Sequence, residues 1–298
     1  MSTLLRYALG TAVTGGLVVA AGAYFARRQA TQPAGDPPQT PAPDPQTIPA
    51  PKPTSTGPIA WDGALPLPTA ADIKGDLGRN WGTTPADLRP LFLLAEEASG
   101  IVGAGRILAV IAYRESRFIP AAHNGDAESE QSERNYSYNA YHNNKGRNPT
   151  LMHGDAAAAF GSGGLFGALA PYFLWTGVQE LKDKAPLLAS DPRIMFLPRV
   201  AAFAATVYLQ RLLKNYDIRD VADIKVGWGS ISLLIPPGRD GDTYNKIRSQ
   251  FWEDAKTVGI DLGDVATIPT KMRADNWPGV GAVFQKLVGQ LPVPKALV

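Results

Sequence analysis

Residues 29–58 constrain the fold of this chain more than any other segment, because they cannot contribute to a hydrophobic core. The stretch QATQPAGDPPQTPAPDPQTIPAPKPTSTGP holds ten prolines and almost no large apolar side chain. Such a composition favours an extended, disordered linker, since it buries too little apolar surface to offset the conformational entropy lost on folding. At about 3.1 Å per residue, the linker reaches at most on the order of 90 Å. The chain therefore divides into an N-terminal segment, residues 1–28, and a folded region that begins near residue 59.

An uncharged apolar stretch, residues 7–25, precedes the linker. It runs for nineteen residues between Arg6 and the pair Arg27 and Arg28, and about 20 apolar residues are needed to cross a bilayer. We therefore predict a membrane-spanning anchor within residues 1–28, which would place the folded region in the periplasm or otherwise outside the cytoplasmic membrane. A cleaved signal peptide is one alternative, because residues 21–23 fit a small-residue cleavage site. A buried helix of a soluble protein is the other.

The charge balance and the residue counts exclude several classes of protein. The 298 residues include 29 basic and 27 acidic side chains, a net charge of +2. This balance does not indicate the basic surface of a nucleic-acid-binding protein. The chain has no cysteine and only three histidines, so it cannot form disulfides or thiolate metal sites, and a histidine-rich metal centre is disfavoured. We expect no metal, no cofactor and no nucleic-acid partner.

The folded region, residues 59–298, is predicted to be mainly α-helical, since no alternating strand pattern is sustained. Thr84 is the expected N-cap and Pro85 the first residue of a helix that ends at Gly100. Further helices are expected at residues 105–116, 197–216, 221–228, 242–259 and 279–291. The polar residues 121–160 indicate a long insertion between the second and third of these helices.

One carboxylate, Glu115, lies on the apolar face of the second predicted helix. Ile107, Ile111 and Glu115 are spaced four residues apart, which places them on one side of a helix. Partial burial and a position near the helix C-terminus both disfavour the charged form of a carboxyl group. The pattern is therefore typical of a general acid. An ion pair of Glu115 with Arg114 or Arg117 is the alternative.

The residues that follow Glu115 carry a resemblance to a known family. The segment ESRFIPAA resembles the first motif of the soluble-type (SLT) lytic transglycosylases, which are relatives of goose-type lysozyme. The segment GSGGLFGALAPY, residues 161–172, resembles the family's Gly-Leu-Met-Gln motif. VGWGSISL resembles the third motif with Trp228 in place of a tyrosine, and GDTYNKI resembles the fourth, with Tyr244 as the match. Because the motifs occur in the family's order, the resemblance implies a lysozyme-like catalytic domain.

The resemblance further implies a peptidoglycan lytic transglycosylase with Glu115 as its single acid and base catalyst. Such an enzyme cleaves the bond between N-acetylmuramic acid and N-acetylglucosamine and forms a 1,6-anhydro sugar. The substrate-binding residues expected on this basis are Ser116, Gly163, Gly164, Leu165, Phe166, Trp228 and Tyr244. Helix capping is the alternative for Ser116, and core packing is the alternative for each aromatic residue. The expected partners are peptidoglycan glycan strands and the membrane, while envelope or virion assembly partners stay open.

Departures from the family pattern keep two other functions open. Gly167 stands in place of the family's glutamine, Gly229 stands in place of its asparagine, and residues 121–160 lengthen the spacing between the first two motifs. A lysozyme-type hydrolase is one alternative, with a second carboxylate from the acidic residues of this insertion. A non-catalytic peptidoglycan-binding or assembly component of an envelope machine or phage particle is the other. Within the insertion, residues 134–148 are predicted to add a saccharide-binding surface.

Overall fold

The computed structural model describes residues 65, 67–75, 77–78, 80–122, 162–169, 196–266 and 276–289. The predicted anchor, the predicted linker and all but residues 121–122 of the predicted insertion lie outside these ranges. Among the helices within them, none is both long enough and apolar enough to cross a membrane.

The described part of the chain is mainly helical, which confirms the prediction of a mainly α-helical fold. Its helices are η1 (Ala70–Asp72), α2 (Arg89–Ser99), α3 (Ala104–Ser116), α8 (Pro198–Asn215), α9 (Val221–Gly229), η3 (Ile231–Leu234), α10 (Asp242–Val258) and α11 (Val280–Leu287). Two short strands, β1 (Ser162–Gly163) and β2 (Ala168–Leu169), form an antiparallel hairpin. Ser162 lies opposite Leu169, and Gly163 lies opposite Ala168.

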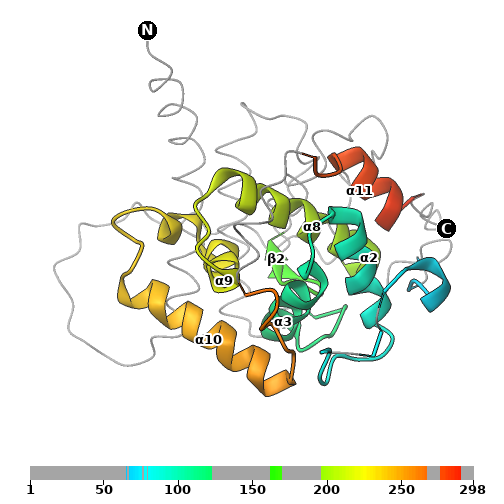
Figure 1. Ribbon diagram of the computed structural model, residues 1–298, viewed down its shortest axis with the longest axis horizontal. Helices are drawn as coiled ribbons and strands as arrows, with labels where there is room; N and C mark the ends of the chain where they lie inside the picture. Colours follow the sequence, from blue (N-terminus) through cyan, green and yellow to red (C-terminus); the bar gives the residue numbers. More distant parts are fainter. Residues whose placement is uncertain are drawn as a thin grey trace, which may run out of the picture.

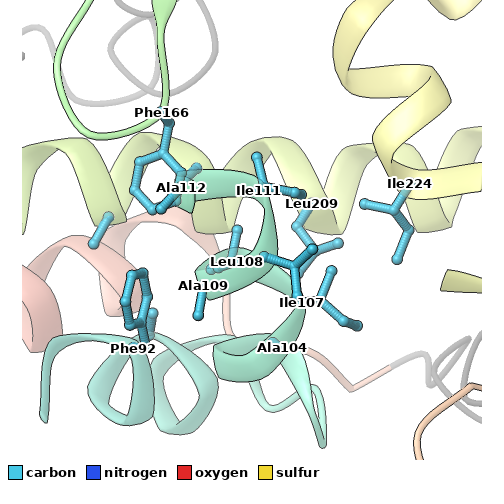
Figure 2. Packing of buried hydrophobic residues seen from close by; sticks show 14 of the residues in the cluster. Phe92, Ala104, Ile107, Leu108, Ala109, Ile111, Ala112, Phe166, Leu209 and Ile224 are labelled. Atoms are coloured by element: carbon cyan, nitrogen blue, oxygen red, sulfur yellow. The ribbon is translucent and has the colours of Figure 1, made fainter. Parts of the chain in front are cut away.

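Helix α3 lies at the centre of this arrangement (Figure 1), where it packs against α2 and α10. Its residues from Ala104 to Ala112 are buried, apart from Arg106. Figure 2 shows its side chains packed among Phe92 of α2, Leu209 of α8 and Ile224 of α9. A helix that is apolar on nearly all sides must be enclosed by its neighbours. The polar last turn of α3, which carries Glu115, is therefore where this helix emerges from the core.

Most predicted helix boundaries agree with the structure, but the predicted start of α2 is wrong. The helix begins at Arg89, with Leu88 at the N-cap, and the Oγ1 atom of Thr84 has no hydrogen-bond partner among the residues that the structure describes. Pro90 explains the later start, because it lacks the N–H that an earlier helix would need and its ring would clash with the carbonyl four residues before it. At the second helical position, neither problem arises. The other end is as predicted, since Gly100 closes the helix with a left-handed φ of 70°.

A buried ionic network fixes α9 against α10 and the loop that joins them. Asp223 of α9 has no exposed surface, and four groups donate hydrogen bonds to its carboxylate. The donors are the Tyr244 hydroxyl at 2.5 Å, the Arg219 backbone N–H at 2.8 Å, the Arg239 guanidinium at 3.0 Å and the Arg248 guanidinium. Because every oxygen of the buried carboxylate is paired, the network holds the helix that carries Lys225 and Trp228 in one position.

Candidate functional site

The Glu115 carboxylate is bound by a lysine of another helix. The Nζ atom of Lys225, on α9, lies 2.6 Å from Oε1 of Glu115. The two side chains are 12 % and 10 % exposed, so the pair is largely enclosed by protein. The expectation that Glu115 lies on the buried face of its helix agrees with this exposure. The alternative, an ion pair with Arg114 or Arg117, named the wrong partner, because the cation that binds Glu115 comes from α9.

The two neighbouring arginines of α3 have other contacts. Arg114 donates to Oδ2 of Asp254, on α10, at 2.6 Å. Arg117 is exposed, and its guanidinium lies 4.2 Å from the centre of the Tyr113 ring. Burial raises the pKa of Asp254, whereas the positive charges of Arg114, Arg117 and Lys225 oppose that rise. A second buried carboxyl group therefore lies within the electrostatic reach of Lys225.

The chain turns sharply after Ser116, at the end of α3. Arg117 and Phe118 both have left-handed backbone conformations, with φ values of 54° and 65°. Residues other than glycine pay about 1–2 kcal/mol each for this conformation. Packing offsets part of the cost, because the Phe118 ring contacts those of Phe92 and Tyr113, at 6.4 Å and 5.7 Å between centroids. Strained backbone of this kind is common beside functional groups.

Two hydrogen bonds attach the β1–β2 hairpin to the last residue of α3 and to the segment that follows this helix. The Ser116 hydroxyl lies 2.7 Å from the carbonyl of Leu165 and 2.9 Å from that of Ala112, and the Gly164 N–H donates to the carbonyl of Ala122 at 2.8 Å. Ser116 is 6 % exposed. Its hydroxyl thus joins the first two sequence motifs and also bonds a carbonyl of its own helix, as the alternative of helix capping describes. Contact of Ser116 with a substrate stays a prediction.

The aromatic residues of the second and third motifs lie together. The rings of Phe166 and Trp228 are 6.0 Å apart between centroids, and the Trp228 indole N–H donates to the Phe166 carbonyl at 3.4 Å. Figure 2 shows Phe166 reaching from the hairpin toward α3. Lys225 and Trp228 are three residues apart on α9, so they share one face of that helix. This face therefore contacts Glu115 through the lysine and the hairpin through the tryptophan.

Several of the predicted substrate-binding residues are buried. Gly163, Gly164, Leu165 and Phe166 all belong to this class, and Tyr244 is only 1 % exposed. Burial raises the pKa of the Tyr244 hydroxyl, and the hydrogen bond to Asp223 raises it further. Tyr244 therefore serves the ionic network of α9 and α10, as the alternative of core packing describes. Contact of the hairpin residues with a glycan stays a prediction.

Gly167, which stands where the resemblance predicts a glutamine, lies directly against Glu115. A Cβ atom at this position would be 2.9 Å from Oε2 and 3.2 Å from Cβ of Glu115. Its φ of 57° is also left-handed, a conformation that favours glycine. The glycine therefore fits the observed orientation of Glu115, and a glutamine here would require either the carboxylate or the hairpin to move.

We expect replacement of Gly167 by alanine to displace Glu115 and to lower stability. The left-handed backbone alone costs an L-residue about 1–2 kcal/mol, and the new methyl group adds the close contact with Glu115. Chemical denaturation would measure the stability loss. Gly281→Ala is the matched control, because this helical glycine has open space around a Cβ atom and an ordinary φ. Equal stability of Gly167→Ala and the wild type would contradict the expected clash.

Sequence reasoning missed Lys225 as the partner of Glu115 and Asp254 as the partner of Arg114. Lys225 is the single charged residue in the apolar run between Ile224 and Trp228. A lysine in such a run is the same signal that drew attention to Glu115. Asp254 had no comparable signal, since α10 carries charges at many positions.

The described residues hold no group of three or more His, Cys, Asp and Glu side chains that could bind a metal ion. The predicted acidic and saccharide-binding residues at 123–160 lie outside the description. A hollow of about 480 Å³ lies elsewhere, and none of the predicted site residues lines it. Its lining residues are Lys74, Gly75, Asn80, Trp81, Leu93, Glu96, Glu97, Gly100, Ile101, Val102 and Arg106.

No family model, curated protein or solved structure matches this chain in the comparisons with known proteins. The chemistry of the site must therefore be inferred from its own residues. They provide an enclosed carboxylate with one oxygen bound by a cation, beside a glycine-rich hairpin and a tryptophan.

Proposed function

We propose that this protein is a membrane-tethered peptidoglycan lytic transglycosylase with a lysozyme-like catalytic domain. The observation that carries the proposal is the meeting of three sequence motifs around one carboxylate. Gly167 lies against Glu115, Ser116 is bonded to Leu165, and Trp228 is bonded to Phe166. Residues that are separated by more than a hundred positions thus form one local group, as a catalytic site requires.

In this proposal Glu115 acts first as an acid and then as a base. Its carboxyl group donates a proton to the glycosidic oxygen while the bond from that oxygen to C1 of N-acetylmuramic acid breaks. The acetamido group of the sugar stabilises the positive charge that develops at C1. The C6 hydroxyl then attacks C1 and gives its proton to the Glu115 carboxylate. A 1,6-anhydro sugar forms, no water is consumed, and Glu115 regains the protonated state in which it began.

The predicted tether gives this activity a physical rationale. A linker that reaches on the order of 90 Å would allow a domain anchored in the membrane to act on a wall that lies beyond it. The expected partners are accordingly glycan strands on one side and the membrane on the other.

The ion pair between Glu115 and Lys225 favours a second candidate, a non-catalytic protein that binds peptidoglycan or takes part in envelope or virion assembly. A carboxylate held by a lysine at 2.6 Å resembles a structural ion pair as much as a general acid. In this candidate Glu115 would link α3 to α9 and would have no role in chemistry.

Digestion of purified sacculi by the full-length protein separates the candidates. We expect soluble fragments whose mass spectra show 1,6-anhydro ends, each lighter by one water than the corresponding hydrolytic product. Fragments with reducing ends would identify a lysozyme-type hydrolase instead. Binding to sacculi without release of fragments would support the non-catalytic candidate.

A further inference from the structure

The two oxygen atoms of Glu115 have different surroundings. Oε1 accepts a hydrogen bond from the Lys225 ammonium at 2.6 Å. Oε2 lies against Gly167, 2.9 Å from where a Cβ atom of that residue would be. The cation therefore holds one carboxylate oxygen, and the missing side chain of Gly167 leaves room for the other.

We propose that Lys225 is the positioning residue of Glu115, which holds Oε1 and the negative charge and leaves Oε2 to exchange a proton with the substrate. The role of Oε2 in proton exchange rests on the proposed function. The effect of Lys225 on the protonation of Glu115 rests on the ion pair alone.

The backbone of α9 is fixed on both sides of Lys225. It lies two residues after Asp223, whose carboxylate is fixed by the buried network, and three residues before Trp228, whose indole is bonded to the hairpin. Asp223 and Trp228 both belong to α9, so their contacts fix the position of the helix and of the Lys225 ammonium that it carries. A lysine with a flexible stem and no such support would hold a carboxylate much less closely.

The other charges near the pair do not replace Lys225. Arg114 is engaged by Asp254, and Arg117 is exposed over Tyr113. Asp254 of α10, which interacts electrostatically with Lys225, has a raised pKa because of its burial. Removal of the Lys225 ammonium would therefore leave Glu115 largely enclosed and without a bonded cation among the described residues.

This arrangement has a measurable consequence for the pH dependence of activity. A general acid works in its protonated form, and a neighbouring cation favours the charged form. Without Lys225, Glu115 should retain its proton to a higher pH, so the alkaline limb of the pH–activity profile should shift to higher pH.

The test compares full-length wild type, Lys225→Met and Lys225→Arg in two measurements. Carboxyl carbon NMR follows the protonation of Glu115, whose resonance is the one that is absent from Glu115→Gln. Sacculus digestion across pH gives the activity profile. Lys286→Met is the matched control, because Lys286 forms a comparable but exposed ion pair with Glu97 at 2.9 Å.

We expect Lys225→Met to raise the pH at which Glu115 is half protonated and to shift the alkaline limb by the same amount. Lys225→Arg and Lys286→Met should stay close to the wild type in both measurements. An unchanged Glu115 titration in Lys225→Met would overturn the proposal, whether or not the protein digests sacculi. If the wild type digests nothing while the titration still moves, the proposed function fails, but the control of charge by Lys225 stands.

Discussion

Replacing Asp223 by alanine should lower the free energy of unfolding by about 3–5 kcal/mol, the usual cost of removing one partner from a buried ion pair. The reason is that Arg239 and Arg248 would both lose a carboxylate that has no exposed surface. The Tyr244 hydroxyl, which donates to the same carboxylate, would also be left without its partner. Denaturation by urea, followed by far-ultraviolet circular dichroism, would measure the change.

Asp240→Ala is the matched control for this substitution. Asp240 is also paired with an arginine, Arg219 at 2.5 Å, but both side chains are about half exposed, at 59 % and 49 %. Pairs that water can solvate contribute little to stability, so the control should unfold close to the wild type. If Asp223→Ala were no less stable than Asp240→Ala, the buried network would not be what fixes α9.

The helices could be predicted from the sequence because their information is local. The apolar spacing in α3, α8 and α10 repeats at the helical period, and Gly100 and Gly259 provide left-handed ends. The start of α2 was missed because the cap signal at Thr84 is also local, whereas the decisive residue, Pro90, lies inside the predicted helix. A proline after a cap signal should shift the predicted start toward itself.

The candidate site could be predicted only in part, because its contacts are not local. The position of Glu115 on the buried face followed from helical spacing alone. Its partner did not, since Lys225 is 110 residues further along the chain and meets it only through the packing of α9. The burial of Tyr244 could not be predicted for the same reason, because it depends on Asp223 and the surrounding helices. Spacing places a residue on a face, but tertiary packing decides what that face meets.

Replacing Glu115 by glutamine should abolish the release of anhydro fragments from sacculi while it leaves the fold intact. General acid–base catalysis contributes about 10²–10⁴-fold, and an amide cannot donate or accept the proton that cleavage requires. The fold should persist because glutamine has nearly the shape of glutamate, and its amide oxygen can still accept the hydrogen bond from Lys225. Loss of activity can thus be separated from loss of structure by circular dichroism of the same sample.

Glu97→Gln provides the control for this loss. Glu97 is also ion-paired with a lysine, Lys286 at 2.9 Å, but it lies on the exposed face of α2. The same chemical change at this position removes one charge and one ion pair without touching the site, so activity should stay at the wild-type level. Equal rates for Glu115→Gln and the wild type would show that Glu115 is not the acid. The ion pair with Lys225 would then be structural, and an active wild type would have to draw its acid from another carboxyl group, of which buried Asp254 is the first to test.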